Sequence, residues 1–192
     1  MSVKIVALAG SSREGSFNKK LVQVAKLGAE EAGATVEYVD LRDFQIPIFD
    51  EDLEKAEGPT EDVKKLKEIF KASDGILIAS PEYNSSVSAL LKNAIDWLSR
   101  HAEGEGRLAA FSGKSAGIMS ASPGALGGLR GLVHLRSILS NIGVTVIPEQ
   151  RAIGQAHEAF GEDGLLKDQG QLDAIKAIGA RVAKLAQALK SA

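Results

Sequence analysis

The sequence contains no cysteine, which excludes disulfides, thiol nucleophiles and thiolate-held zinc or iron–sulfur centres. It also lacks an excess of either charge: the formal net charge is -2, which gives no basic field for nucleic acid. No apolar run approaches the length of a membrane span, and the first residues lack the apolar stretch of a signal peptide. We therefore expect a soluble, cytoplasmic protein that binds neither nucleic acid nor membranes.

What the chain does contain is the composition of an ordinary globular protein. Its 192 residues are 44% hydrophobic and 25% charged, which is enough for one domain with a sizeable core. There is no internal repeat, low-complexity segment or linker, so we expect a single domain over residues 1–192.

Apolar runs typical of strands alternate with helical patterns along the chain. The predicted strands are 3–9, 35–39, 75–79, 114–121 and 143–147. The predicted helices are 18–32, one capped by Thr60, 86–100, 126–141 and 168–190. This alternation favours a parallel α/β sheet with helices on both faces. Residues 41–58 have few periodic cues, so we expect a covering or partner-contacting loop there.

One segment points to a ligand. Residues 10–18 read Gly-Ser-Ser-Arg-Glu-Gly-Ser-Phe-Asn and join the first predicted strand to the first predicted helix. The amides and hydroxyls of such a turn, together with the helix dipole, form an anion site. Arg13 adds a planar fork of donors that suits phosphate oxygens. The plainer interpretation is a surface turn whose serine caps the helix. We call residues 10–18 the phosphate loop.

Two common nucleotide loops do not fit this segment. Gly10 and Gly15 have the spacing of a Walker A loop, but Ser16 and Phe17 stand where that loop needs lysine and a hydroxyl. A dinucleotide fingerprint needs glycine at position 12, where this chain has Ser12. A hydroxyl-rich loop with one arginine instead suits a terminal phosphate monoester, such as that of FMN.

Two further loops follow predicted strands. Residues 80–86 contain Pro81, which stiffens the chain, and Tyr83, which offers a flat amphipathic ring. Residues 120–128 are rich in glycine, which lets backbone approach a flat ring closely. Ligands of open α/β sheets bind outside the carboxyl ends of the strands, so all three loops should converge on one site.

Together these motifs resemble the NAD(P)H-dependent FMN reductase family, in particular its soluble quinone and chromate reductase branch. The matching residues are the phosphate loop, Pro81–Asn84, Leu91–Trp97, Gly127–Gly128 and His134–Arg136. The resemblance implies a flavodoxin-like α/β/α three-layer sandwich with a five-stranded parallel sheet in the order 2-1-3-4-5. It also implies non-covalent FMN at the switch point of that sheet.

The resemblance assigns roles to particular residues. Those that would hold the FMN phosphate are Ser11, Arg13, Ser16, Phe17 and Asn18. Those that would line the isoalloxazine are Pro81, Glu82, Tyr83 and Asn84, followed by Ser85, with Ser120 and Gly124 near the other edge of the ring. Many relatives carry an aromatic residue in place of Ser85, and Pro-Gly-Gly in place of residues 88–90. These departures concern the substrate side and leave the phosphate loop untouched.

The resulting hypothesis is an enzyme in which the flavin carries the chemistry and no side chain is catalytic. NADPH or NADH would pass a hydride to the flavin, and a quinone, free flavin or metal oxyanion such as chromate would then take the electrons in a ping-pong cycle. No metal ligand set is expected. The alternatives are a flavodoxin-type electron carrier, a flavin-binding regulatory protein and a nucleotide hydrolase.

The predicted helix 86–100 is apolar around more than one face. Its apolar residues are Leu90, Leu91, Ala94, Ile95, Trp97 and Leu98. This exceeds what one sheet contact requires, so we predict that the helix also packs against another subunit; the alternative is a deeply buried helix of a monomer. Family members assemble as dimers or tetramers, which implies a homodimer or homotetramer with the flavin site near a subunit boundary.

Overall fold

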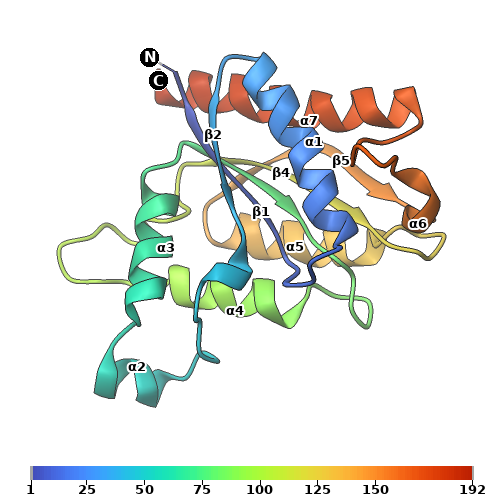
Figure 1. The fold of residues 1–192 in the computed structure, drawn as a ribbon. Helices are drawn as coiled ribbons and strands as arrows, with labels where there is room; N and C mark the ends of the chain where they lie inside the picture. The colour runs from blue at the N-terminus through green and yellow to red at the C-terminus, as the bar shows by residue number, and fades with distance from the viewer. Residues whose placement is uncertain (1, 192) are drawn as a thin grey trace.

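The computed structural model describes residues 2–191 as one parallel sheet with helices on both faces (Figure 1). The five strands are β1 (Lys4–Ala9), β2 (Thr35–Val39), β3 (Gly75–Ala79), β4 (Ser115–Ala121) and β5 (Thr145–Ile153). They lie side by side in the order β2-β1-β3-β4-β5, and all four neighbouring pairs are parallel. The predicted strand order is therefore confirmed.

Seven α-helices and a short 3₁₀ turn connect the strands within the described residues. The helices are α1 (Phe17–Glu31), α2 (Glu51–Glu57), α3 (Glu61–Lys71), α4 (Ala89–Leu98), α5 (Leu129–Asn141), α6 (Ala156–Ala159) and α7 (Gln169–Lys190), and the 3₁₀ turn η1 is Leu41–Asp43. Helices α1 and α7 cover one face of the sheet, and α3, α4 and α5 cover the other (Figure 1). This is the predicted three-layer sandwich.

The middle of the sheet is buried on both faces. Every residue of β3 and of β4 is buried, because helices cover the two strands from both sides. The apolar run 75–79 predicted this central position. Since β1, β3 and β4 are fixed by this core, the loops at their carboxyl ends are held on a rigid support.

Two glycines allow α1 and α7 to approach closely. A Cβ built on Gly28 of α1 would lie 2.0 Å from the carbonyl oxygen of Lys176 in α7. A Cβ on Gly179 of α7 would lie 1.9 Å from the carbonyl oxygen of Ala25 in α1. Backbone therefore packs against backbone at this crossing, and no side chain fits between the two helices.

The structure corrects two of the predicted segments. Residues 41–58 were expected to be a loop, but they contain η1 and α2, which Asp50 caps by accepting hydrogen bonds from two amides. The fifth strand continues to Ile153, past its predicted end at residue 147. The strand passes through Pro148 and Glu149 with a shift of register against β4, and an edge strand tolerates a proline at such an irregularity.

Most of the apolar surface of α4 is covered by the chain itself, as expected for a deeply buried helix, and the subunit contact at this helix stays a prediction. The indole nitrogen of Trp97 donates to the carbonyl of Pro47 at 2.8 Å, and the ring of Phe49 packs edge-on against the indole, 5.1 Å between centroids. The Asn93 amide also donates to Pro47. Residues 46–49 thus bury the extra apolar surface of α4.

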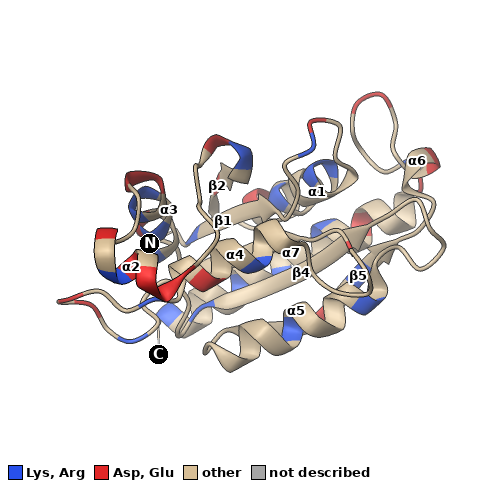
Figure 2. Cartoon of the chain, turned by 90° about the horizontal axis from the view of Figure 1, so that it is seen from below, with Lys and Arg blue, Asp and Glu red and all other residues tan. Residues whose placement is uncertain are grey.

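Charges of both signs are spread over the chain, and acidic residues gather on α2 (Figure 2). Within residues 2–191, no helix combines the length and the apolar character that crossing a membrane requires.

Glu105, in the loop after α4, joins two lysines of α3. Its carboxylate lies 2.6 Å from the Lys67 ammonium and 2.7 Å from that of Lys71. Hydrogen bonds from Lys67 and Lys71 lower the pKa of Glu105 to about 2. The carboxyl therefore titrates well below its unfolded pKa, and its contribution to stability depends on pH.

We expect Glu105→Gln to lower the free energy of unfolding at pH 7 by on the order of 1 to 2 kcal/mol. A depressed pKa stabilises the fold above the unfolded value near 4.5, and this contribution is lost as pH falls toward 2. Urea unfolding from pH 7 to pH 3 should show the variant and the parent converging at low pH. Glu68→Gln, which removes the exposed partner of Lys71, serves as the control and should change little. A constant difference between Glu105→Gln and the parent at every pH would contradict this assignment.

Candidate functional site

Three loops meet at the carboxyl edge of the sheet, as predicted. They are the phosphate loop, the β3 loop (residues 80–88) and the β4 loop (residues 122–128). The amide of Gly10 donates to Ala79 at the end of β3. The Ser88 hydroxyl donates to the Gly10 carbonyl at 2.6 Å and accepts from the Leu91 amide, so it joins the phosphate loop to the start of α4.

The N-terminus of α1 retains amide donors that no capping side chain uses. Ser16 is its N-cap, and within the described residues its side chain accepts no capping hydrogen bond. By contrast, side chains cap the N-termini of α2, α3, α4 and α7. The first turn of α1 also carries no acidic residue, as judged over its described residues. This end of the helix therefore keeps the donors and the positive dipole that an anion requires.

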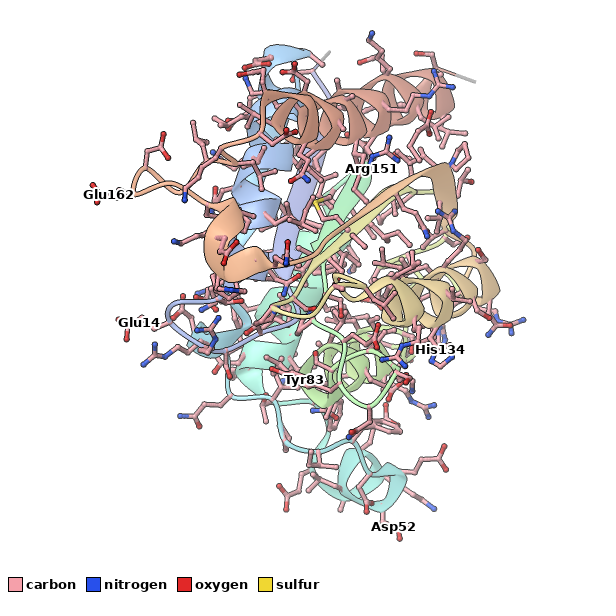
Figure 3. All side chains as sticks on the ribbon, turned by 90° about the vertical axis from the view of Figure 1, so that its right-hand side faces the viewer. Glu14, Asp52, Tyr83, His134, Arg151 and Glu162 are labelled. Carbon is pink, nitrogen blue, oxygen red and sulfur yellow. The ribbon has the colours of Figure 1, made fainter. Side chains whose placement is uncertain are left out.

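The side chains around this helix end are suited to a phosphate. Ser11 and Ser16 are buried, whereas Arg13 is exposed and lies over the Phe17 ring, 5.2 Å from its centroid. Glu14 extends outward from the loop (Figure 3), and its carboxylate is almost fully exposed. The ring of Phe17 stacks on that of Phe160 at 6.0 Å, which fixes the first turn of α1 against the C-terminal part of the chain.

Asn18, which was predicted to hold the phosphate, has its side chain bonded within the protein. Its side chain is buried, donates to the Ala121 carbonyl and accepts from the Ala121 amide, both at 2.9 Å. These two bonds join the first turn of α1 to the end of β4. The side chain thus holds the loop in place, and the Asn18 backbone amide is one of the first amides of α1, which no side chain caps.

The β3 loop folds as a tight two-residue turn. Tyr83 and Ser86 pair through two backbone hydrogen bonds of 3.0 Å. Asn84 and Ser85 lie between them with φ values of 50° and 67°, which is the pattern of a type I′ turn. Tyr83 is 57% exposed, so its ring is available to a ligand. Pro81 is buried beneath the turn.

Glu82 was expected to line the ring of a flavin, but its side chain bonds to the first turn of α5. The carboxylate accepts from the Arg130 amide at 3.0 Å, the Gly131 amide at 3.2 Å and the Arg130 Nε at 2.7 Å. Burial works to raise the pKa of Glu82, but the hydrogen bonds from Arg130 and Gly131 outweigh it, so this pKa lies below its ordinary value.

The end of β4 carries a buried hydroxyl next to a glycine that cannot be replaced without a clash. Within residues 2–191, Ser120 Oγ has no hydrogen-bond partner. Gly128 has a φ of 92°, and a Cβ there would lie 1.9 Å from this oxygen. Gly124 is open: a Cβ on it would meet only Ser122, at 3.7 Å. A buried hydroxyl without a partner is a group that a polar ligand edge could satisfy.

Sequence reasoning missed three contacts around this site. Ser88 was noted only as a departure from the family pattern, although a serine three residues before Leu91 is a capping signal. Arg130 was not considered, and its link to Glu82 spans 48 residues, which no local pattern reports. His134 lies 2.9 Å from the Ser86 hydroxyl, at the base of the β3 turn.

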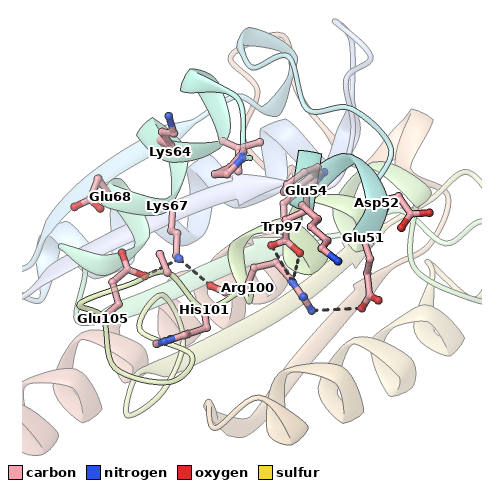
Figure 4. A pocket seen from close by; sticks show the side chains of 14 residues that line it. Glu51, Asp52, Glu54, Lys64, Lys67, Glu68, Trp97, Arg100, His101 and Glu105 are labelled. Atoms are coloured by element: carbon pink, nitrogen blue, oxygen red, sulfur yellow. Dashed lines mark hydrogen bonds and ion pairs between the residues drawn. The ribbon is translucent and has the colours of Figure 1, made fainter. Parts of the chain in front are cut away.

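A wide cavity lies elsewhere, between α2, α3 and the C-terminal end of α4, with a volume of about 850 Å³ (Figure 4). Two ion pairs lie along its wall: Arg100 with Glu54 at 2.9 Å, and Lys67 with Glu105. None of the seven residues of α2, all of them described, is buried, so this helix stands off from α3 and leaves the gap. We place the candidate site at the strand-end loops, because the uncapped N-terminus of α1 and the three loops meet there.

Comparisons with known proteins identify the family of this chain. Residues 3–158 match the family of NADPH-dependent FMN reductases. The chain is 38% identical over 167 residues to an NAD(P)H-dependent FMN reductase of Pseudomonas aeruginosa, covering 86% of this chain and 85% of that protein. It is 37% identical over 174 residues to a quinone reductase of Escherichia coli, covering 89% and 88%.

Solved structures show the same fold. The flavoenzyme NAD(P)H:(acceptor) oxidoreductase FerB of Paracoccus denitrificans superposes with a TM-score of 0.80 at 28% identity, over 96% of this chain and 97% of that chain. A flavodoxin from the domain Archaea superposes with a TM-score of 0.63 at 13% identity, over 96% and 99%, which shows a flavodoxin-like fold alone. The chain belongs to the family of NADPH-dependent FMN reductases.

Proposed function

We propose that this chain is a cytoplasmic, FMN-dependent NAD(P)H oxidoreductase that reduces quinones, free flavin or metal oxyanions such as chromate. The observation that carries the proposal is the uncapped N-terminus of α1, beside Arg13 and two buried serines, where three strand-end loops meet. Family membership supports the same conclusion, since the curated relatives are named as FMN and quinone reductases.

The residues at the site suit both the phosphate and the isoalloxazine ring of FMN. The phosphate would be held by Ser11, Ser16, the Arg13 guanidinium and the first amides of α1. The isoalloxazine would lie among residues 81–85, with the orphaned Ser120 hydroxyl and the open Gly124 at its other edge. FMN, when bound, supplies the redox chemistry.

The chain's own residues would then bind and orient two substrates in turn. The exposed Tyr83 offers a flat apolar surface at the mouth of the site, which suits both a nicotinamide and a quinone ring. Donor and acceptor would use the same exposed surface, so we expect ping-pong kinetics, with parallel lines in double-reciprocal plots.

The visible spectrum of the purified protein tests this function. Protein loaded with FMN should be yellow and should bleach when NADPH is added without oxygen, then regain its colour with a quinone. Bleaching that needs a separate reductase would instead favour an electron carrier. Binding of flavin without turnover by any acceptor would favour a regulatory protein. Failure to bind flavin at all would contradict the proposal.

We also propose that the chain forms a homodimer or homotetramer, through a surface on α5 besides the α4 face that the sequence suggested. The apolar side chains of Leu129 and Val133 on α5 are 45% and 60% exposed, and that of Leu126 in the β4 loop just before it is 55% exposed. Contiguous exposed apolar surface of this kind is typical of an interface.

We expect light scattering to give a mass of at least two chains, and Val133→Glu to shift it toward the monomer. Ile48→Glu, which changes an exposed apolar residue away from α5, serves as the control and should leave the mass unchanged. A monomer at all concentrations would contradict the oligomer.

A further inference from the structure

We propose that Glu82 is a positioning residue of the flavin site, whose carboxylate acts through the first turn of α5 and sets the separation of the β3 and β4 loops. The inference rests on the proposed function and adds to it a role for a side chain that does not face the ring. Its basis is the set of contacts that this carboxylate makes across the two loops.

The carboxylate of Glu82 takes the place of an N-cap side chain for α5. The N-cap of this helix is Gly128, which has no side chain to offer. Glu82 supplies the missing acceptor from another part of the chain, through the amides of Arg130 and Gly131. A negative charge at this end is further stabilised by the helix dipole. The Glu82 side chain is 8% exposed, so the interaction is shielded from solvent.

The packing at this contact leaves little room for the two loops to move apart or together. A Cβ built on Gly131 would lie 3.1 Å from the Ser86 carbonyl and 3.4 Å from the Glu82 Cβ. The first turn of α5 therefore packs directly on the backbone of the β3 loop. The hydrogen bonds of Glu82 hold the two together, and the glycine sets how closely they approach.

The same turn of α5 fixes the β4 loop. Gly128 packs on Ser120, and a Cβ on Gly127 would lie 2.6 Å from the carbonyl carbon of Ile153 in β5. A displacement of α5 would therefore move the residues proposed for the far edge of the isoalloxazine. The hydrogen bonds of Glu82 connect the first turn of α5, next to the β4 loop, with the β3 turn that carries Tyr83.

The carboxylate is already committed to protein donors. Both of its oxygens accept hydrogen bonds, and Arg130 Nη2 is also within ion-pair distance. The first turn of α5 thus orients this carboxylate. We expect Glu82 to affect flavin binding by holding the β3 and β4 loops in position around the isoalloxazine ring. Glu82 should therefore influence binding of the isoalloxazine, whereas Arg13 should influence binding of the phosphate.

The experiment compares FMN with riboflavin, which has the same ring but no phosphate. We expect Glu82→Ala to weaken binding of both flavins by the same factor, roughly tenfold. Glu82→Gln keeps an oxygen that can accept from the two amides, so it should restore most of the affinity. Arg130→Ala leaves both amide contacts in place and should cost less than threefold. Arg13→Ala should weaken FMN alone. Thermal unfolding without flavin shows whether each variant folds.

Each result supports or overturns the inference. Equal losses for the two flavins in Glu82→Ala, with rescue by Glu82→Gln, support it. Unchanged affinity, or a loss confined to FMN, overturns it while leaving the proposed function intact. If Glu82→Ala does not fold, Glu82→Gln is compared with the parent instead. Affinity losses in Glu82→Gln that differ between FMN and riboflavin would then overturn the inference. Failure of the unmodified protein to bind either flavin overturns the proposed function, and this inference with it.

Discussion

Arg13→Ala is expected to weaken FMN binding about 30-fold, the equivalent of about 2 kcal/mol for charge-assisted hydrogen bonds to a phosphate. Arg13 is exposed beside the N-terminus of α1, and its guanidinium lies over the Phe17 ring, which limits the orientations it can take. Riboflavin lacks the phosphate, so its affinity should change by less than about twofold. Quenching of flavin fluorescence in parallel titrations measures both constants.

Arg42 provides the matched control for this variant. Its guanidinium lies 4.0 Å from the Glu14 carboxylate of the phosphate loop and is more than half exposed. Arg42→Ala therefore removes a positive charge from the same region without removing a proposed phosphate ligand. An equal loss of FMN affinity in the two variants would mean that the general field, and not a specific contact of Arg13, attracts the phosphate.

Gly28→Ala is expected to destabilise the fold by about 3 kcal/mol, because the new methyl group would collide with backbone. The nearest atom is the Lys176 carbonyl oxygen at 2.0 Å, and a rigid carbonyl cannot rotate away as a side chain can. The helices α1 and α7 would have to separate along their contact. Gly179→Ala on the opposite helix should have a similar effect, since it meets the Ala25 carbonyl. Urea unfolding of the flavin-free proteins measures the loss.

Gly170, in the first turn of α7, is the control for the two glycine variants. A Cβ at Gly170 would meet only the Asp168 carboxylate, at 3.4 Å, so Gly170→Ala should change stability by less than about 1 kcal/mol. If Gly28→Ala proves as stable as Gly170→Ala, the close crossing of α1 and α7 is not present in solution.

Much of the fold could be predicted from local sequence. The apolar run of β3 and the Gly/Ser turn after β1 are signals carried by neighbouring residues, and both lie where they were expected. The end of β5 was missed because the apolar run ends at Ile147, and only pairing with β4 extends the strand to Ile153. Helix α2 was missed because it has no apolar face: none of its residues, all within the described range, is buried.

The site could be located from the sequence, but the directions of its side chains could not. The three loops converge as predicted, because parallel strands bring their carboxyl ends to one edge. Asn18 and Glu82, however, bond to partners 103 and 48 residues away. Those partners exist only in the folded chain, so a side chain that resemblance assigned to the ligand is instead used to hold the loops together.

A crystal structure of the protein with FMN tests the central claim most directly, since it shows where the phosphate lies. We predict phosphate oxygens within hydrogen-bonding distance, about 2.7 to 3.2 Å, of the first amides of α1 and of Ser11, with the Arg13 guanidinium alongside. A phosphate bound elsewhere, with the N-terminus of α1 facing only water, would contradict this account of the chain.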